Sequence, residues 1–111
     1  MSGVFNRESV HDLTPEEVKR GLDAGEIILV DVREPNETAL ERIPGSVLVP
    51  LSCFDTDEIP DPEGRAVVFS CRSGNRSVKA SELAQAAGLP YKEHLAGGII
   101  AWKAAGYPTE Q

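Results

Sequence analysis

The chain has little of what several classes of protein require. Its 111 residues include only two cysteines and two histidines. Two cysteines cannot build the disulfide framework of a small secreted domain, and the isolated His11 and His94 lack the spacing of a metal site. We therefore expect no metal and no other cofactor, and a role for cysteine other than cross-linking.

Long apolar runs and an excess of basic charge are also absent. No apolar run approaches the roughly 20 residues of a membrane-spanning helix, and residues 1–10 lack the apolar stretch of a signal peptide. The net charge is −7, with 18 acidic and 11 basic residues, whereas nucleic-acid binding usually needs a basic domain. These absences predict a cytoplasmic protein with no membrane or nucleic-acid partner, unless an export signal has been removed from the sequence.

What is present is an alternation of short apolar runs with helical patterns. The predicted strands cover residues 27–30, 47–49, 66–69 and 91–95, and the predicted helices 15–24, 36–41, 77–87 and 99–104. The segment 54–64, which contains acidic residues and prolines, is expected to be a surface excursion. Strands separated by helices predict an α/β fold with a parallel sheet that is covered by helices on both faces.

Two of the predicted helices have detailed signals. Thr14 is the predicted N-cap of the first, with Pro15 in its first turn and Glu17 closing a capping box. In the helix that begins near Ser77, apolar residues recur at i, i+3, i+4 and i+7, which predicts one buried stripe. This stripe consists of Ala80, Leu83, Ala84 and Ala87.

The most informative segment is the loop from Cys71 to Ser77, between a predicted strand and a predicted helix. A cysteine in this place faces loop amides and the positive end of the helix dipole, and both favour the thiolate. The residues between these two are Arg72, Ser73, Gly74, Asn75 and Arg76. Residues 64–81 contain four of the basic residues and none of the acidic ones, which suits a small anionic substrate. We therefore predict that Cys71 is a nucleophile; the alternative is a buried structural cysteine.

Asp31 also follows a predicted strand, and parallel sheets bind their ligands beyond the carboxyl ends of the strands. We therefore expect Asp31 to lie near Cys71. Together with Arg33 it either braces the cysteine loop or forms a surface ion pair. Trp102 is predicted to pack in the core, the alternative being a place in the pocket wall. Cys53 is predicted to be a small buried hydrophobe rather than a partner of Cys71.

Five segments together resemble the single-domain rhodaneses, a family of thiosulfate sulfurtransferases. These segments are 29–35 (Leu-Val-Asp-Val-Arg-Glu-Pro), 43–46 (Ile-Pro-Gly-Ser), the loop 71–77, 97–102 (Gly-Gly-Ile-Ile-Ala-Trp) and 106–108 (Gly-Tyr-Pro). The resemblance implies a three-layer rhodanese-like fold for a single domain over residues 1–111, with its core at about 9–108. The chain departs from the family's pattern at Glu41-Arg42 and at Leu95-Ala96, which leaves its donor or acceptor preference open.

The loop and the resemblance imply a reaction in two steps. Cys71 attacks the outer sulfur of a small anionic donor such as thiosulfate, and the resulting persulfide passes its sulfur to cyanide in an assay or to a thiol in the cell. An acceptor protein is an alternative to a small thiol. The amides of residues 72–77 would hold the sulfur, Arg76 would dock the departing sulfonate, and Arg72 would contribute to the field at the entrance. A thiol that is already ionised would need no general base, and no histidine lies near the loop in the sequence.

Two other functions remain open. In the family of phosphatases with an arginine-capped cysteine loop, five residues separate the cysteine from the arginine. In this chain only four residues separate Cys71 from Arg76. The shorter loop favours sulfur transfer over phosphoester or arsenate chemistry. The other alternative is a non-catalytic interaction module or sulfur-relay module, which the intact pair of loop arginines disfavours.

Overall fold

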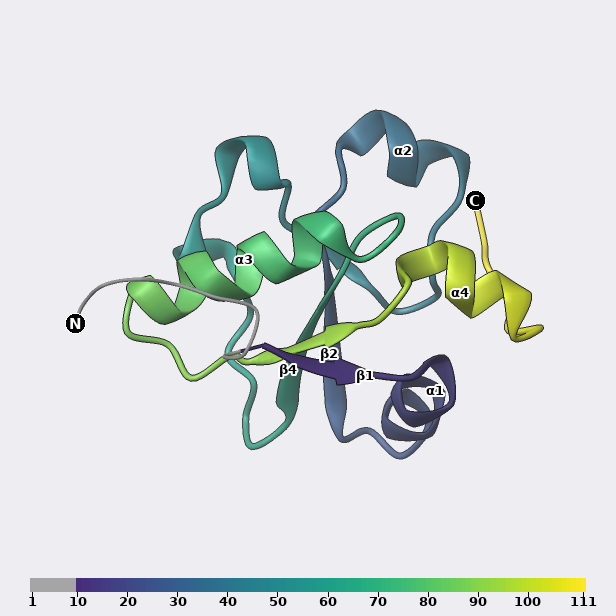
Figure 1. Ribbon diagram of the computed structural model, residues 1–111, viewed down its shortest axis with the longest axis horizontal. Helices are drawn as coiled ribbons and strands as arrows, with labels where there is room; N and C mark the ends of the chain where they lie inside the picture. The colour runs from purple at the N-terminus through teal and green to yellow at the C-terminus, as the bar shows by residue number, and fades with distance from the viewer. Residues whose placement is uncertain (1–9) are drawn as a thin grey trace.

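The protein is built on a sheet of five parallel strands, as a computed structural model describes it for residues 10–111 (Figure 1). The strands are β1 (His11–Leu13), β2 (Ile27–Asp31), β3 (Val47–Leu48), β4 (Ala66–Ser70) and β5 (Glu93–Leu95). Their order across the sheet is β1-β5-β4-β2-β3, and each neighbouring pair runs parallel. The prediction of a mainly parallel α/β sheet is therefore confirmed.

Helices cover both faces of this sheet, which gives three layers. The α-helices are α1 (Pro15–Asp23), α2 (Pro35–Leu40), α3 (Asn75–Ala86) and α4 (Gly98–Ala104), and two 3₁₀ turns are η2 (Leu51–Cys53) and η3 (Thr56–Glu58). Ala80 of α3 shares one buried apolar cluster with Phe69 of β4. Val18 of α1 and Trp102 of α4 share a second cluster with Val68 of the same strand. Because neighbouring residues of a strand point to opposite faces, α3 covers one face of the sheet while α1 and α4 cover the other, as Figure 1 shows.

Local sequence signals predict the start of α1 correctly. The Thr14 hydroxyl accepts a hydrogen bond from the Glu17 amide at 3.1 Å, and the Glu17 carboxylate accepts one from the Thr14 amide at 2.9 Å. The helix ends at Asp23, and Gly25 follows it with a φ of +71°. The core position of Trp102 is also confirmed, since it is buried and donates its indole N–H to the Pro108 carbonyl at 2.8 Å.

The start and the buried face of α3 differ from the prediction. The helix begins at Asn75, because Gly74 adopts a φ of +102° and caps it. The buried positions of α3 are Ser77, Ala80, Ser81 and Ala84. Leu83 is 36% exposed and Ala87 lies at the surface, so half of the predicted stripe is wrong. The two serines can be buried because each has a hydrogen-bond partner inside the protein.

The edge of the sheet also differs from the prediction. β1 was not predicted, because its three residues are polar or half exposed and show no apolar alternation. β5 begins at Glu93, two residues later than expected. The segment 54–64 is not wholly a surface excursion, since Ile59 is buried and Phe54 packs edge-on against Phe69.

None of the helices within residues 10–111 is long and apolar enough to cross a membrane. The prediction that residues 1–10 contain no signal peptide falls almost entirely on residues 1–9, which lie outside the described residues. The first residue of the predicted core, residue 9, lies outside them as well.

Candidate active site

The thiol of Cys71 lies at the carboxyl end of β4, where the chain turns into α3. Its Sγ atom accepts hydrogen bonds from the Gly74 amide at 3.1 Å and from the Ser77 amide at 3.3 Å. The residue is only 1% exposed. Two of the predicted loop amides therefore point at the sulfur, at the N-terminal end of a twelve-residue helix. Both the amides and the helix dipole stabilise negative charge on that atom.

The first turn of helix α4 is hydrogen-bonded to the backbone of this loop. The Ile99 amide donates to the Cys71 carbonyl at 2.9 Å, and the Ile100 amide donates to the Arg72 carbonyl at 3.2 Å. A Cβ atom on Gly98 would collide with both of these carbonyl groups, and the φ of Gly98 is +61°. Only glycine therefore allows α4 to approach the cysteine loop so closely.

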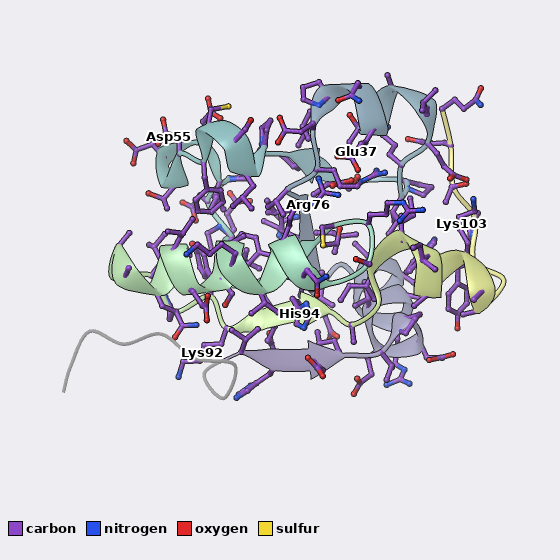
Figure 2. All side chains as sticks on the ribbon, turned by 45° about the horizontal axis from the view of Figure 1, so that its top comes forward. Glu37, Asp55, Arg76, Lys92, His94 and Lys103 are labelled. Atoms are coloured by element: carbon purple, nitrogen blue, oxygen red, sulfur yellow. The ribbon has the colours of Figure 1, made fainter. Side chains whose placement is uncertain are left out.

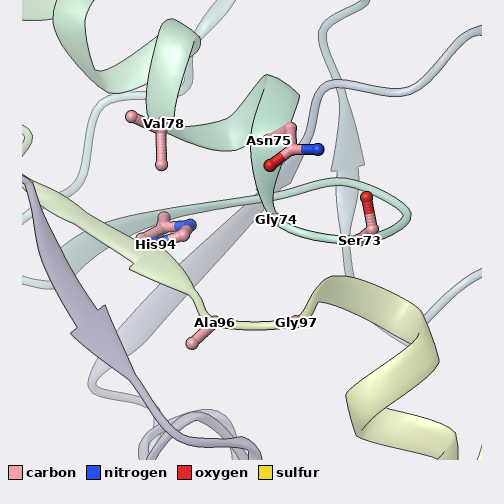
Figure 3. A pocket seen from close by; sticks show the side chains of 7 residues that line it. All are labelled: Ser73, Gly74, Asn75, Val78, His94, Ala96 and Gly97. Carbon is pink, nitrogen blue, oxygen red and sulfur yellow. The ribbon is translucent and has the colours of Figure 1, made fainter. Parts of the chain in front are cut away.

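A chain of hydrogen bonds links Cys71 to a histidine and an aspartate. The Cys71 thiol lies 3.6 Å from Ser77 Oγ, Ser77 Oγ lies 2.8 Å from His94 Nδ1, and His94 Nε2 lies 2.7 Å from Asp12 Oδ1. Ser77 and His94 are buried, and the histidine also borders a cavity of about 240 Å³ beside the loop (Figure 3). The sequence-based prediction that His94 is isolated is therefore wrong. The order of the strands brings His94 in β5 and Asp12 in β1 into one chain of hydrogen bonds with Cys71.

Sequence reasoning missed Asp12 and His94 as site residues. A weak signal for His94 was available, since it occupies a predicted strand just before the segment 97–102 that resembles the family. No comparable signal marked Asp12, because β1 itself was not predicted.

On the other side of the loop, Arg76 is held by an acidic residue. Its two terminal nitrogens bond both carboxylate oxygens of Glu37 in α2, at 2.7 and 2.9 Å. These hydrogen bonds lower the pKa of Glu37 from 4.5 to about 2, and they raise the pKa of Arg76. Figure 2 shows the pair on one side of the start of α3 and His94 on the other. The guanidinium group of Arg76, which was expected to dock a sulfonate, is therefore paired with a carboxylate instead.

The other loop arginine, Arg72, is exposed, and no salt bridge joins it to an acidic residue within residues 10–111. It borders a second cavity of about 260 Å³, together with Arg33, Glu37 and Lys103. Arg72 thus presents exposed positive charge one residue along from Cys71, and its role at an entrance stays a prediction.

Asp31 and Arg33 form a buried ion pair, so the alternative of a surface ion pair is wrong. Arg33 Nη2 lies 2.8 Å from Asp31 Oδ2, and the two side chains are 5% and 4% exposed. Arg33 also donates to the Glu41 carbonyl at 2.8 Å. These hydrogen bonds fasten the end of α2 to β2 rather than reaching into the cysteine loop. The pair thereby supports the element that carries Glu37.

The position of Cys53 also corrects the prediction. It lies in η2 and is exposed, whereas a small buried hydrophobe was expected. Its neighbour Ser52 is held at the surface by a hydrogen bond to Glu34 at 2.6 Å. Cys53 and Cys71 are both free thiols.

Comparisons with known proteins agree with the resemblance in the sequence. The model of the rhodanese-like domain matches residues 14–105. A sulfurtransferase of Allochromatium vinosum is 35% identical to this chain, and the match covers 89% of this chain and 94% of that protein. The uncharacterized protein slr1261 of Synechocystis is 39% identical over 87% of this chain, which spans only 54% of that protein.

Among solved structures, the thiosulfate sulfurtransferase of Pseudomonas aeruginosa superposes with a TM-score of 0.79 and 31% identity. The match covers 94% of this chain and 21% of that one. The similarity therefore extends over nearly all of this chain in sequence and in fold. The chain belongs to the rhodanese-like domain family.

Proposed function

We propose that this protein transfers a sulfane sulfur from thiosulfate, or from a related persulfide or polysulfide, to a thiophilic acceptor through a persulfide on Cys71. The observation that carries the proposal is the pair of amides, from Gly74 and Ser77, directed at a cysteine sulfur at the N-terminal end of α3. Such a site stabilises a thiolate and then a persulfide anion. The relatives named sulfurtransferases support the same reaction type.

The reaction has two displacement steps at sulfur. In the first, the Cys71 thiolate attacks the outer sulfur of thiosulfate, the sulfur–sulfur bond of the donor breaks, and sulfite leaves with the electron pair. In the second, a thiophile such as cyanide or a thiolate attacks the outer sulfur of the persulfide, and the Cys71 thiolate is restored. This division into two steps is covalent catalysis with ping-pong kinetics.

The two loop arginines take different parts in this proposal. Arg72 attracts the donor dianion, because its charge is exposed and uncompensated within residues 10–111. Arg76 shares its charge with Glu37, which holds its guanidinium in an ion pair. We assign it to holding the start of α3 in place. A reducing compartment such as the cytoplasm would keep Cys71 available as a thiol.

Intact mass spectrometry after incubation with thiosulfate tests the function. We expect the wild-type protein and the Cys53→Ser variant to gain one sulfur atom, and the Cys71→Ser variant to gain none. Cys53 is the matched control because it is the chain's other free thiol. Subsequent addition of cyanide should remove the added sulfur and yield thiocyanate.

Two results would contradict the proposal. If the wild-type protein gained no sulfur from thiosulfate, a polysulfide or glutathione persulfide, the interaction module would be the better hypothesis. If it instead hydrolysed p-nitrophenyl phosphate in a Cys71-dependent manner, the phosphatase alternative would replace sulfur transfer.

A further inference from the structure

We propose that Ser77, His94 and Asp12 form a proton relay that takes the thiol proton from Cys71. The inference rests on the proposed function, since it concerns how the attacking thiolate arises. It replaces the sequence-based expectation that the loop needs no base. Ser77 contacts the reacting sulfur and is a catalytic residue in this scheme, while His94 and Asp12 act through it as positioning residues.

The geometry of the relay is continuous from the sulfur to the surface. Successive separations are 3.6 Å from Cys71 Sγ to Ser77 Oγ, 2.8 Å from Ser77 Oγ to His94 Nδ1, and 2.7 Å from His94 Nε2 to Asp12 Oδ1. The first three groups are buried, whereas the Asp12 side chain is 54% exposed. The relay therefore connects a sulfur that is almost inaccessible to water with a carboxylate that water reaches.

The chemistry of the groups fixes the direction of each hydrogen bond. An ionised Asp12 can only accept, so His94 Nε2 carries the hydrogen and Nδ1 is left as an acceptor. The Ser77 hydroxyl can then donate to Nδ1 while its oxygen accepts from the Cys71 thiol. His94 is in this arrangement the neutral tautomer that can receive a proton, and Asp12 stabilises the imidazolium that forms.

The transfer is balanced in protons and charge. The S–H bond of Cys71 breaks and its proton moves to Ser77 Oγ, while the original hydroxyl proton of Ser77 moves to His94 Nδ1. The electron pair of the S–H bond stays on sulfur. The product is a thiolate and imidazolium pair, in which Ser77 now donates its hydroxyl hydrogen to Sγ and accepts from His94. The thiolate is then held by three donors, because the amides of Gly74 and Ser77 already point at it.

Among the described residues, two groups that can ionise face His94 along the relay. Asp12 faces it from β1, and Cys71 faces it across Ser77. The residue beside it in β4 is the apolar Phe69, and Val78 of α3 borders the same cavity. The nearby Arg76 is paired with Glu37 on the opposite side of the loop. The relay is thus the route by which solvent pH reaches the sulfur.

The test measures the rate of iodoacetamide alkylation of Cys71 against pH, in a Cys53→Ser background so that one thiol remains. The rate follows the fraction of Cys71 that is present as thiolate, and the midpoint of the wild-type profile is the reference for the variants. His94→Asn should move the midpoint upward and lower the rate at pH 7 by about tenfold, since one pKa unit changes the thiolate fraction about tenfold. Asp12→Asn should act in the same direction with a smaller shift.

The matched control is His11→Asn, which removes an exposed histidine from the same strand as Asp12. It should leave the profile unchanged. Alkylation needs no sulfur donor, so a protein without sulfurtransferase activity would still report on the relay. An unchanged profile in His94→Asn would overturn the inference. Should that variant fail to fold, an unchanged profile in Asp12→Asn, whose side chain is exposed, would overturn it instead.

Discussion

The cysteine loop is held on its two sides by different kinds of interaction. On one side, Arg76 and Glu37 form an ion pair that joins α3 to α2 and remains partly open to solvent. On the other side, Ser77 and His94 form a buried hydrogen bond that joins α3 to β5. The first interaction is an ion pair that is partly open to water, and the second is a hydrogen bond between two buried side chains.

This difference separates two tasks at one sulfur. An ion pair near solvent is weakened by the high dielectric and by salt, so its contribution to stability is small. A buried chain of hydrogen bonds is directional and can move a proton without moving its atoms far. The Arg76–Glu37 pair therefore suits holding the start of α3 against α2, and the histidine side suits the ionisation of the thiol.

The largest effect is expected from breaking the histidine side. Ser77→Ala removes the hydroxyl between Cys71 and His94, so kcat/KM for thiosulfate should fall by about 100-fold, the lower end of the range for acid–base catalysis. Ser81→Ala is the matched control, because Ser81 is equally buried one turn further along α3 and donates to the Tyr91 carbonyl at 2.6 Å. It should cost about 1–2 kcal/mol of stability and leave the activity of the folded protein within about twofold. Equal losses of activity in the two variants would show that Ser77 only supports packing.

The next effect concerns the packing of α4 against the cysteine loop at Gly98. Gly98→Ala would force α4 away from the carbonyl groups of Cys71 and Arg72, and we expect it to lower the free energy of unfolding by at least about 3 kcal/mol. Gly106→Ala is the control, since Gly106 also has a positive φ but has open space around its Cα. It should cost only about 1–2 kcal/mol. Urea denaturation of both variants measures the difference, and similar losses would mean that the close approach of α4 is unimportant.

A smaller effect is expected from Arg72. Arg72→Ala should raise the KM for thiosulfate by roughly three- to tenfold at low salt, because it removes exposed positive charge at the entrance. The difference from wild type should shrink as salt is added, since screening acts over about 8 Å at physiological ionic strength. Arg65→Ala, at an exposed arginine paired with Glu63, should leave KM unchanged. A loss with Arg72→Ala that persists at high salt would indicate a direct contact with the donor.

The smallest effect concerns the pH dependence of the arginine side. The folded pKa of Glu37 is about 2 and its ordinary value is 4.5, so the stabilisation is fully present above pH 4.5 and is lost as the pH falls towards 2. Glu37→Gln should therefore cost about 0.5–1 kcal/mol at pH 7, with a penalty that shrinks steadily below pH 4.5. Glu58→Gln, on the exposed turn η3, should show no such trend. A penalty for Glu37→Gln that stays constant from pH 7 to pH 3 would mean that the ion pair does not stabilise the fold.

The sequence was most informative where the site is local in the chain. The strand β4, the loop with Cys71 and the start of α3 are contiguous, and their residue types alone indicate a nucleophile beside loop amides. The capping box of α1 was equally readable, because Thr14 and Glu17 are three residues apart. These features depend on backbone preferences that a short segment carries by itself.

The hydrogen bonds of His94 could not be predicted from the sequence, because they join segments that are far apart in the chain. Asp12 and His94 are 82 residues apart, and they meet only because β1 joins the sheet next to β5. Buried serines on α3 gave the wrong stripe, because an apolar pattern cannot show that a polar side chain will find a partner. The pairing of Arg76 with Glu37 was not readable either, because it depends on how α2 sits over the loop.

The position of β1 has a consequence for how the reactivity of Cys71 would be controlled. This strand has three residues, lies at the edge of the sheet and pairs with β5, and Asp12 is its central residue. Short edge elements open in local fluctuations of the native state that require much less free energy than global unfolding. Each such opening would detach the carboxylate from His94, and Leu13 from the apolar cluster around Trp102, while the loop and α3 stay folded. The fraction of molecules with an activated thiol would then follow the local opening equilibrium of β1, which amide hydrogen exchange at His11 and Leu13 would report.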